Sequence, residues 1–459
     1  MAEHSLKRQL KVLTIPVFIE MALVMLLGAV DTVMLSRYSD NSVAAVGLDN
    51  QLMNLVFLVY QFFSMGAAIL CAQYIGAGLH KRLVQVVGMA LAVNLMLGLV
   101  VSALLFLYAE PLLLLMGLRP ELMPDGLIYL RLTGALSFFQ ALSLTLSASL
   151  RSADKVVYPM VVTGIVNVLN IAGNYALIFG RWGCPQLGVE GAAIATAASR
   201  AVATVLLTVI HFRKHIPRFP LCYFRPMPWQ ELRNLLHIGI PAMSENISYN
   251  LSQVEVTFFI NQIGNEALAA RTYCANMIMF VYLFCISITQ GGDILVGHLV
   301  GQQRHQAAYV LGNYFFRWSM VITLCGSALL ALMGRSILGF FTTNPEIIAM
   351  GVWVLIIDWF LEIGRTSNIF AVSTLRATGD AFYPVVIGII FNWTIAVGLS
   401  YVIGIPLGYG LVGMWVAFAL DENIRGIILM RRWRSGIWRK KGFVAAQKKV
   451  EKRNTTSTK

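Results

Sequence analysis

The sequence predicts an all-α polytopic membrane protein with twelve transmembrane helices in two six-helix lobes related by a pseudo-twofold axis along the membrane normal. Three observations predict this fold class: an apolar composition, long apolar segments along the whole chain, and an internal repeat. Of the 459 residues, 58% are hydrophobic and 12% are charged, and the mean hydropathy is +0.70. A soluble globular protein carries roughly twice that charged fraction. The composition therefore excludes a soluble globule, a disordered chain and a secreted disulfide scaffold.

Each apolar segment is long enough to cross a bilayer core of about 30 Å, which takes roughly 20 helical residues. Lys7, Arg8 and Lys11 lead directly into the first segment, which predicts a membrane anchor rather than a short cleavable signal peptide. We predict spans at residues 10–36, 48–74, 83–109, 124–149, 157–180, 188–211, 235–262, 272–299, 308–333, 346–375, 382–404 and 408–431.

The distribution of Lys and Arg predicts the orientation, because basic residues in short loops are retained on the cytoplasmic side. They gather in alternate loops, near residues 7–11, 81–82, 151–155, 213–233, 304 and 376. We therefore expect a multi-pass protein of the cytoplasmic (inner) membrane with both termini in the cytoplasm. The tail after Arg431 is also basic. Next to a membrane, we interpret it as a signal that keeps this end in the cytoplasm and as a segment attracted to anionic lipid, rather than as a site for nucleic acid.

The two halves of the chain repeat each other with a register of 225 residues. Each copy holds six spans, an even number, so both copies enter the membrane in the same orientation. This predicts an N-terminal six-helix lobe (1–211), a basic cytoplasmic linker (212–234), a C-terminal six-helix lobe (235–431) and a basic cytoplasmic tail (432–459). The matching pairs include Pro16 and Pro241, Glu20 and Glu245, Gly76 and Gly301, Arg151 and Arg376, Pro159 and Pro384, and Asn167 and Asn392.

Ionisable residues inside the spans indicate a function, since each costs roughly 2.5 to 3.5 kcal/mol at mid-bilayer on insertion scales. Two like-oriented bundles suit alternating access to a central site. In span 1, Glu20 and Asp31 are eleven residues apart, which places them within about 20° of one face and about 16 Å apart along the axis. They line one cavity wall, or else Asp31 is solvated near the surface or caps a neighbouring helix.

Three further spans carry polar stripes. In span 10, Asp358, Glu362 and Arg365 share one helical face, where they contact substrate or coupling ion, or else form a self-neutralising structural ion pair. Span 7 is too polar on one side to face lipid, so it borders a cavity or a structural hydrogen-bond network. Its stripe holds Glu245, Ser248, Ser252 and Glu255, with Asn246, Asn250 and Gln253 beside it. In span 5, Asn167, Asn170 and Asn174 either bind directly or hold helices together.

No enzyme motif accompanies these stripes. The sequence contains no Walker A loop, no H-E-x-x-H and no G-x-S-x-G, so we expect no catalytic residues, no cofactor and no ATP-driven pump. Energy then comes from an ion gradient or from the gradient of the substrate itself. The six cysteines form no C-x-x-C pair, which predicts neither a disulfide framework nor a metal site.

Several local motifs resemble those of the multidrug and toxic compound extrusion (MATE) family. The resemblance covers essentially the whole chain, including its length, span number and repeat. The motifs are Val30-Asp31-Thr32-Val33-Met34, Asn170-Ile171 with Asn174-Tyr175, Leu177-Ile178-Phe179-Gly180, Gly188-Val189-Glu190-Gly191-Ala192-Ala193 with Ala195-Thr196, and Leu375-Arg376-Ala377 with Gly379-Asp380.

The resemblance implies a secondary active efflux antiporter that exports organic, often lipophilic cations in exchange for protons or sodium ions. By motif, Asp31 would be the ion-coupling carboxylate, with Asn170, Asn174 and Thr196 completing its pocket. Glu245 would join them, as the acid of a span that begins with Pro. We expect the substrate cavity to include Glu20, Glu255, Asp358, Glu362 and Arg365, and we expect no obligate protein partner.

The chain departs from the family pattern in two respects, one in each lobe. Some proton-coupled relatives have Asp where this chain has Asn174, so its coupling pocket has one fewer titratable group. In some relatives the span 7 acid lies one turn further from the Pro, and the span 10 acid falls where this chain has Arg365. Both of these last differences concern the sodium site of the C-terminal lobe.

Three other functions stay open at the level of sequence. A lipid-linked oligosaccharide flippase of the same superfamily would share the fold, although phosphate substrates favour a cavity dominated by Arg. A metabolite facilitator would fit the repeat but not the motifs. A membrane-embedded enzyme would need a nucleophile, metal cluster or cofactor loop that the sequence does not display.

Overall fold

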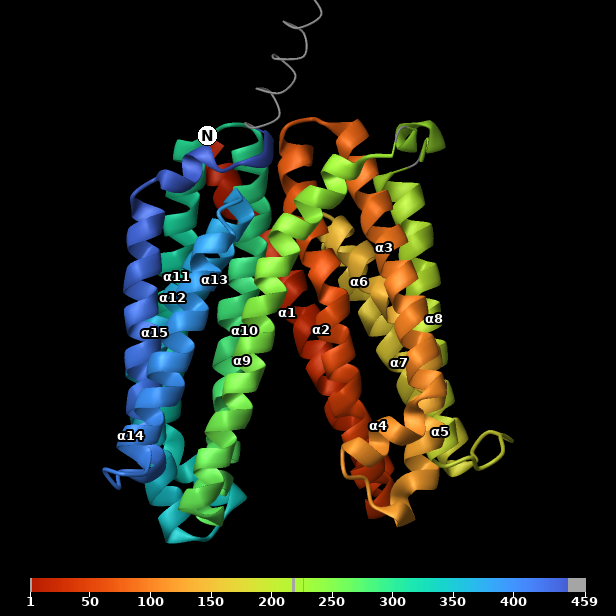
Figure 1. Cartoon of the computed structure of the whole chain (residues 1–459), viewed down its shortest axis with the longest axis vertical. Coiled ribbons are helices and arrows are strands. Elements are labelled where there is room, and N and C mark those ends of the chain that lie inside the picture. Colours follow the sequence, from red (N-terminus) through yellow and green to blue (C-terminus); the bar gives the residue numbers. More distant parts are fainter. Residues whose placement is uncertain (1, 217–218, 226, 445–459) are drawn as a thin grey trace, which may run out of the picture. The chain divides into compact units, whose positions relative to one another are not determined.

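The computed structural model describes residues 2–216, 219–225 and 227–444. Within these ranges every regular element is a helix (Figure 1). The first half contains α1 (Ala2–Ser36), α2 (Asp40–Gly76), α3 (His80–Leu107), α4 (Ala109–Leu115), η1 (Pro120–Leu122), α5 (Met123–Ala135), α6 (Phe138–Ser152), α7 (Val157–Phe179) and α8 (Val189–Ile210). The second half contains η2 (His211–His215), η3 (Leu221–Phe224), α9 (Trp229–Ile263), α10 (Asn265–Gly301), α11 (His305–Phe341), α12 (Pro345–Thr378), α13 (Phe382–Phe391), η4 (Asn392–Leu399), α14 (Ser400–Gly404), α15 (Gly410–Arg434) and η5 (Ile437–Lys440).

The predicted all-α fold with twelve spans is confirmed. Among the described helical segments, nine are long and apolar enough to cross a membrane, one of them running from α13 to the end of α14, and the bent pair of α5 and α6 makes a tenth. The two remaining long helices, α9 and α15, carry ionisable residues at their centres. Several helices extend beyond the predicted spans, because the apolar criterion stops at the first polar residues while the helix continues past them.

One predicted span, residues 124–149, is two helices instead of one. The chain bends by 46° between α5 and α6, at Leu136 and Ser137. The break leaves backbone groups without helical partners, and polar side chains bind one of them: the Phe138 amide donates to Ser102 Oγ at 3.2 Å. Ser137 Oγ lies 2.8 Å from Tyr60 Oη. An interrupted helix is tolerated inside a membrane where neighbours satisfy its freed groups in this way.

The predicted linker, residues 212–234, is partly helical. α9 begins at Trp229, six residues before the predicted span. In its first turn Glu231 is buried and accepts hydrogen bonds from Tyr74 Oη at 2.7 Å and Arg82 Nη1 at 3.2 Å. Burial raises the pKa of Glu231, and both partners oppose that rise. These contacts fasten the end of the linker to α2 and α3.

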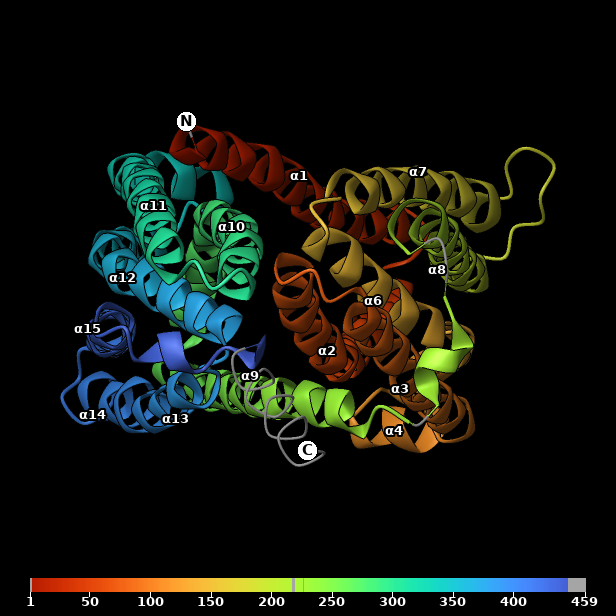
Figure 2. The same cartoon turned by 90° about the horizontal axis from the view of Figure 1, so that it is seen from above.

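Two compact units divide the chain. One runs from Ile19 to Gly239, and the other combines the residues up to Phe18 with those from Ile240 onward. In the first unit α2 packs against α3 and α6, and in the second α12 packs against α11 and α15 (Figure 2). Compared with the predicted lobes, the part of α1 up to Phe18 belongs to the second unit, and the part of α9 up to Gly239 belongs to the first. The boundaries of the predicted lobes stay a prediction.

The basic tail is described only as far as residue 444. In this part Arg432 Nε contacts Asp380 Oδ2 at 2.9 Å, and the Trp438 ring stacks on Trp433 with centroids 4.6 Å apart. The remainder of the predicted tail, residues 445–459, lies outside the described residues.

Candidate functional site

The first unit contains a hydrogen-bonded chain that begins at Asp31. Asn174 Nδ2 donates to Asp31 Oδ1 at 2.7 Å and also reaches Asn170 Oδ1 at 3.0 Å. Asn170 Nδ2 in turn donates to Thr196 Oγ1 at 3.3 Å. The structure thus brings together the four residues of the predicted coupling pocket from α1, α7 and α8. Their role in coupling stays a prediction.

Arg200 is a charged neighbour of this pocket that the sequence analysis did not single out. It lies one helical turn after Thr196 on α8, and its guanidinium sits over the Phe57 ring, 5.0 Å from the centroid. It interacts electrostatically with Asp31 and with Tyr129. The sequence did contain a signal for Arg200, because this charged residue stands in the middle of a predicted span, four residues after Thr196.

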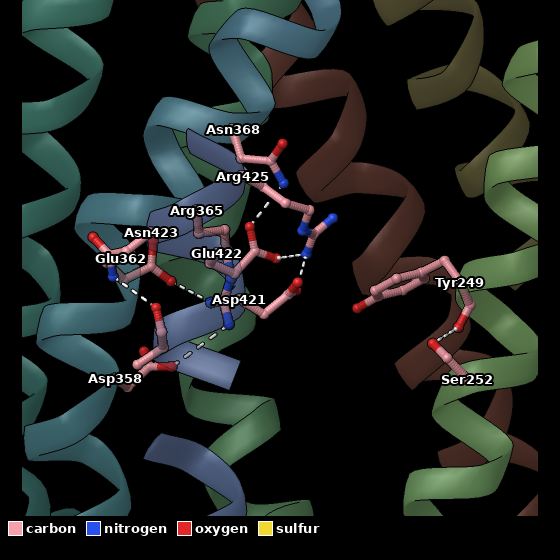
Figure 3. A network of polar contacts seen from close by, with 11 residues as sticks. Tyr249, Ser252, Asp358, Glu362, Arg365, Asn368, Asp421, Glu422, Asn423 and Arg425 are labelled. Atoms are coloured by element: carbon pink, nitrogen blue, oxygen red, sulfur yellow. Dashed lines mark hydrogen bonds and ion pairs between the residues drawn. The ribbon is translucent and has the colours of Figure 1, made fainter. Parts of the chain in front are cut away.

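The second unit contains a denser polar cluster between α12 and α15 (Figure 3). Arg365 Nη1 forms an ion pair with Glu362, and Arg365 Nη2 lies 3.6 Å from Asp358 Oδ1. Trp415 Nε1 donates to the same oxygen of Asp358 at 3.2 Å. Asp358 and Glu362 are buried, at 2% and 0% exposure. The acid and base stripe predicted on span 10 is therefore one connected ion-pair cluster.

α15 supplies the other half of this cluster, which the sequence analysis missed. Arg425 Nη2 pairs with Asp421 and lies 3.0 Å from Glu422 Oε1. Asn368 on α12 donates to Glu422 Oε2 at 2.8 Å. The sequence did offer a signal, because Asp421, Glu422 and Arg425 are three charged residues close together inside the last predicted span.

Two glycines bring these helices close enough for the contacts. A Cβ atom added at Gly364 on α12 would lie 2.3 Å from the Asn423 backbone nitrogen. A Cβ added at Gly426 on α15 would lie 2.9 Å from the Gly364 carbonyl oxygen. Small residues at membrane helix interfaces permit this approach of backbones. The local sequence thus sets the spacing at which charges on α12 and α15 meet.

A cavity of about 210 Å³ lies against this cluster within the second unit. Arg365, Asn368, Glu422 and Arg425 face it from α12 and α15. The rest of the lining consists of Glu245, Asn246, Ser248, Tyr249, Tyr282, Ile369, Gly388, Ile389 and Asn392. Asn392 begins the π-helical turn η4, a feature frequently found at functional sites.

The predicted cavity residues fall into three places. Arg365 lines the cavity itself, whereas Asp358 and Glu362 lie behind Arg365 in the ion-pair cluster. Glu245, which was predicted as an ion-coupling residue, also lines this cavity. Glu20 belongs to the other unit. Glu255 is on α9, half-buried, and is not among the cavity-lining residues.

The repeat preserves one ion pair in both units. Arg151 Nη1 contacts Glu20 Oε1 at 2.9 Å, and Arg376 Nη2 contacts Glu245. Each pair ties the helix that carries the repeated Pro, α1 or α9, to the end of α6 or α12. Both arginines were expected as markers of cytoplasmic loops, and their ion pairs with Glu20 and Glu245 give them a structural role as well.

We expect Arg151→Met to lower the free energy of unfolding by about 1 to 3 kcal/mol, because it leaves the Glu20 carboxylate without its charged donor. Thermal unfolding in detergent, followed by size-exclusion chromatography, measures the change. The charge exchange Glu20→Arg with Arg151→Glu is the matched control and should recover part of the loss. Equal stability of Arg151→Met and the unaltered protein would contradict a stabilising pair.

Comparison with protein-family models decides the family. The MatE family model matches residues 16–176 and again residues 241–409. The chain belongs to the MatE family. The two matched stretches begin 225 residues apart, which is the register of the internal repeat. As a member of this family the chain is a multi-pass membrane transporter.

Relatives within the MatE family align along nearly the whole chain. The chain is 42% identical to the Bacillus subtilis protein named "Uncharacterized transporter YisQ", covering 94% of this chain and 95% of that protein. It is 29% identical to the Thermotoga maritima protein named "Probable multidrug resistance protein NorM", covering 97% and 96%. The relatives therefore share the full architecture.

Solved structures of MatE transporters have the same fold. The Vibrio cholerae MATE transporter VcmN, described in a bent form, matches with a TM-score of 0.87 at 18% identity, covering 95% of this chain and 99% of that one. An outward-facing multidrug resistance MATE family transporter of the MOP superfamily matches with a TM-score of 0.84 at 19% identity, covering 94% and 95%. At this level of identity, the likeness concerns the fold.

Proposed function

We propose that this MatE protein is a secondary active antiporter that exports organic cations across the cytoplasmic membrane in exchange for protons or sodium ions. The observation that carries the proposal is the excess of acid in one cluster of the second unit. Five carboxylates gather there, and the three guanidiniums that contact them leave two negative charges uncompensated if every group is ionised. The acids are Glu245, Asp358, Glu362, Asp421 and Glu422, and the bases are Arg365, Arg376 and Arg425.

Uncompensated buried charge supports exchange of cations. An unpaired ion costs several kcal/mol in a protein interior, so the cluster takes up protons, sodium ions or a cationic substrate to become neutral. A cavity beside the cluster, lined by Glu245, Tyr249 and Tyr282, offers carboxylate and aromatic faces to an organic cation. Two classes of cation then compete for the same carboxylates, and each favours a different conformation.

The pocket at Asp31 is the proposed coupling site of the first unit. Asn174 donates to the ionised carboxylate, and Arg200 lies close enough to act on it electrostatically. A proton on Asp31 removes the charge that Arg200 and Asn174 stabilise. Asp31 takes up this proton from one aqueous side and releases it to the other. The proton gradient across the membrane thereby drives transport of the substrate.

The proposal is tested by efflux of a fluorescent organic cation from proteoliposomes under separately imposed proton and sodium gradients. Uphill transport driven by either gradient is expected, and the effective gradient identifies the coupling ion. Equal downhill movement with no ion gradient would instead indicate a facilitator. The control is liposomes that contain the Asp31→Asn variant at the same protein density.

A lipid-linked oligosaccharide flippase is less favoured, since Arg365 and Arg425 face the cavity but both are held by carboxylates. Anionic phosphate would need guanidiniums free to bind it. Movement of a fluorescent lipid-linked oligosaccharide across the same vesicles, without transport of the cation, would replace the antiporter proposal with this one.

A further inference from the structure

Asp49 is a buried acid that the transport site described above does not use. It lies on α2, nine residues after the helix begins, with 0% of its surface exposed. Neither oxygen of its carboxyl group has a hydrogen-bond partner in the part of the chain that the structure describes. Such a group needs an explanation, since most buried polar atoms in proteins are paired.

The surroundings of Asp49 are apolar. Ala45 and Met53, one turn before and one turn after it on α2, belong to a buried cluster with Leu105, Leu113 and Leu118. A Cβ atom added at Gly126 on α5 would meet Leu118 at 2.7 Å, Leu113 at 3.3 Å and Asp49 Oδ1 at 3.8 Å. The carboxyl group is therefore packed among hydrocarbon side chains.

The internal repeat shows that packing alone does not require an acid here. In the register of 225 residues, Asp49 corresponds to Cys274 and Gly126 to Gly351. Cys274 is equally buried, and its thiol donates to the Gly351 carbonyl oxygen at 3.6 Å. A Cβ added at Gly351 would lie 3.4 Å from that thiol. The same site thus holds a small neutral group in the second unit and a carboxyl group in the first.

No described charged group compensates Asp49. On α5, Asp125 accepts from Ser42 at 2.9 Å, and Tyr129 interacts electrostatically with Asp49, Asp31 and Arg200. The remaining ionisable groups on the elements that pack on α2 form no ion pair or hydrogen bond with Asp49 among the described residues. They are Glu121 on η1, Arg131 on α5, His80, Lys81 and Arg82 at the start of α3, and Arg151 at the end of α6.

An ionised carboxylate without donors is strongly unfavourable in an apolar interior, and such a group takes up a proton instead. We propose that Asp49 is a second proton-binding site of the first unit, occupied in the conformation described here. When its carboxyl group reaches water, the proton leaves to the solvent and the carboxylate remains. This inference extends the proposed ion-coupled transport, but the protonation of Asp49 stands without it.

Infrared difference spectroscopy on the protein in lipid tests the bound proton directly, through the carbonyl stretching band of a protonated carboxyl group. At neutral pH we expect one such band to be lost in Asp49→Asn. The same band should be lost in Asp49→Cys, which copies the residue of the second unit and controls for folding. The band should persist in Cys274→Ala. An unchanged spectrum in a folded Asp49→Cys protein would overturn the proposal.

Release of the proton is tested by adding tetraphenylphosphonium to the purified protein in weak buffer and counting the protons set free. We expect Asp49→Asn to release about one proton fewer per transporter than the unaltered chain. A lost infrared band together with unchanged proton release would overturn the exchange of this proton, while leaving the proposed antiport to be judged by the gradient experiment. Failure of transport in vesicles with the band intact would overturn antiport alone.

Discussion

Asp31→Asn is expected to abolish ion-driven efflux, reducing it to the rate of protein-free liposomes, while the protein still inserts and binds substrate in the second unit. The amide that replaces the carboxylate cannot bind and release a proton, so the proton no longer competes with the organic cation at this position. Asn has nearly the same size and shape as Asp, which limits the disturbance of the packing around Asn174 and Arg200. Proteoliposome efflux under a proton gradient measures the effect, and efflux at the unaltered rate would contradict the assignment of Asp31.

The geometry offers a matched control for this variant. Asn174 Nδ2 and Asp31 Oδ1 are only 2.7 Å apart, so the exchange Asp31→Asn with Asn174→Asp moves the carboxylate across one hydrogen bond. We expect the exchanged protein to regain part of the proton-driven efflux, with a shifted pH dependence. Activity as low as that of the single variant would show that the position of the carboxylate matters as well as its presence.

The parts of the fold that follow from local sequence were predictable. A membrane span is a property of about 20 consecutive residues, so the spans could be placed from one sequence, and the repeat could be found from Pro16 and Pro241. The bend between α5 and α6 could not, because it depends on Ser102 of another helix receiving the freed backbone amide of Phe138.

The site was predictable only where its residues share a helix or a motif. Asp358, Glu362 and Arg365 were found together because they lie on one face of α12. Their neighbours on α15 were missed, since the contact between α12 and α15 depends on the close approach of two glycines. Single-sequence periodicity contains no information on which helix a stripe faces, and this also explains why the pairing of Arg151 with Glu20 was not foreseen.

Arg365→Met should strongly destabilise the second unit. Arg365 contacts both Glu362 and Asp358, so its removal leaves two buried carboxylates without their shared counter-ion. Breaking a buried ion pair by removing one partner costs about 3 to 5 kcal/mol. We expect a loss of that size in the free energy of unfolding, measured by thermal unfolding in detergent with size-exclusion chromatography.

The pH dependence of this loss has a definite sign. Without the guanidinium, the folded variant must hold protons on Asp358 and Glu362, whereas the unfolded chain gives them up near neutral pH. The folded state then binds more protons than the unfolded state, so the stability of Arg365→Met falls as the pH rises. The difference from the unaltered protein should be larger at pH 8 than at pH 5, and a difference that does not depend on pH would contradict buried ionisable partners.

Two controls separate loss of charge balance from loss of a side chain. Arg335→Met, at an exposed position of α11, should change stability by no more than about 0.5 kcal/mol. Neutralising the whole set, with Asp358→Asn and Glu362→Gln added to Arg365→Met, should restore most of the stability, because a buried ion cluster can often be replaced as a unit without cost. The restored protein should nevertheless transport poorly if these carboxylates exchange cations, and normal efflux would assign Asp358 and Glu362 a structural role only.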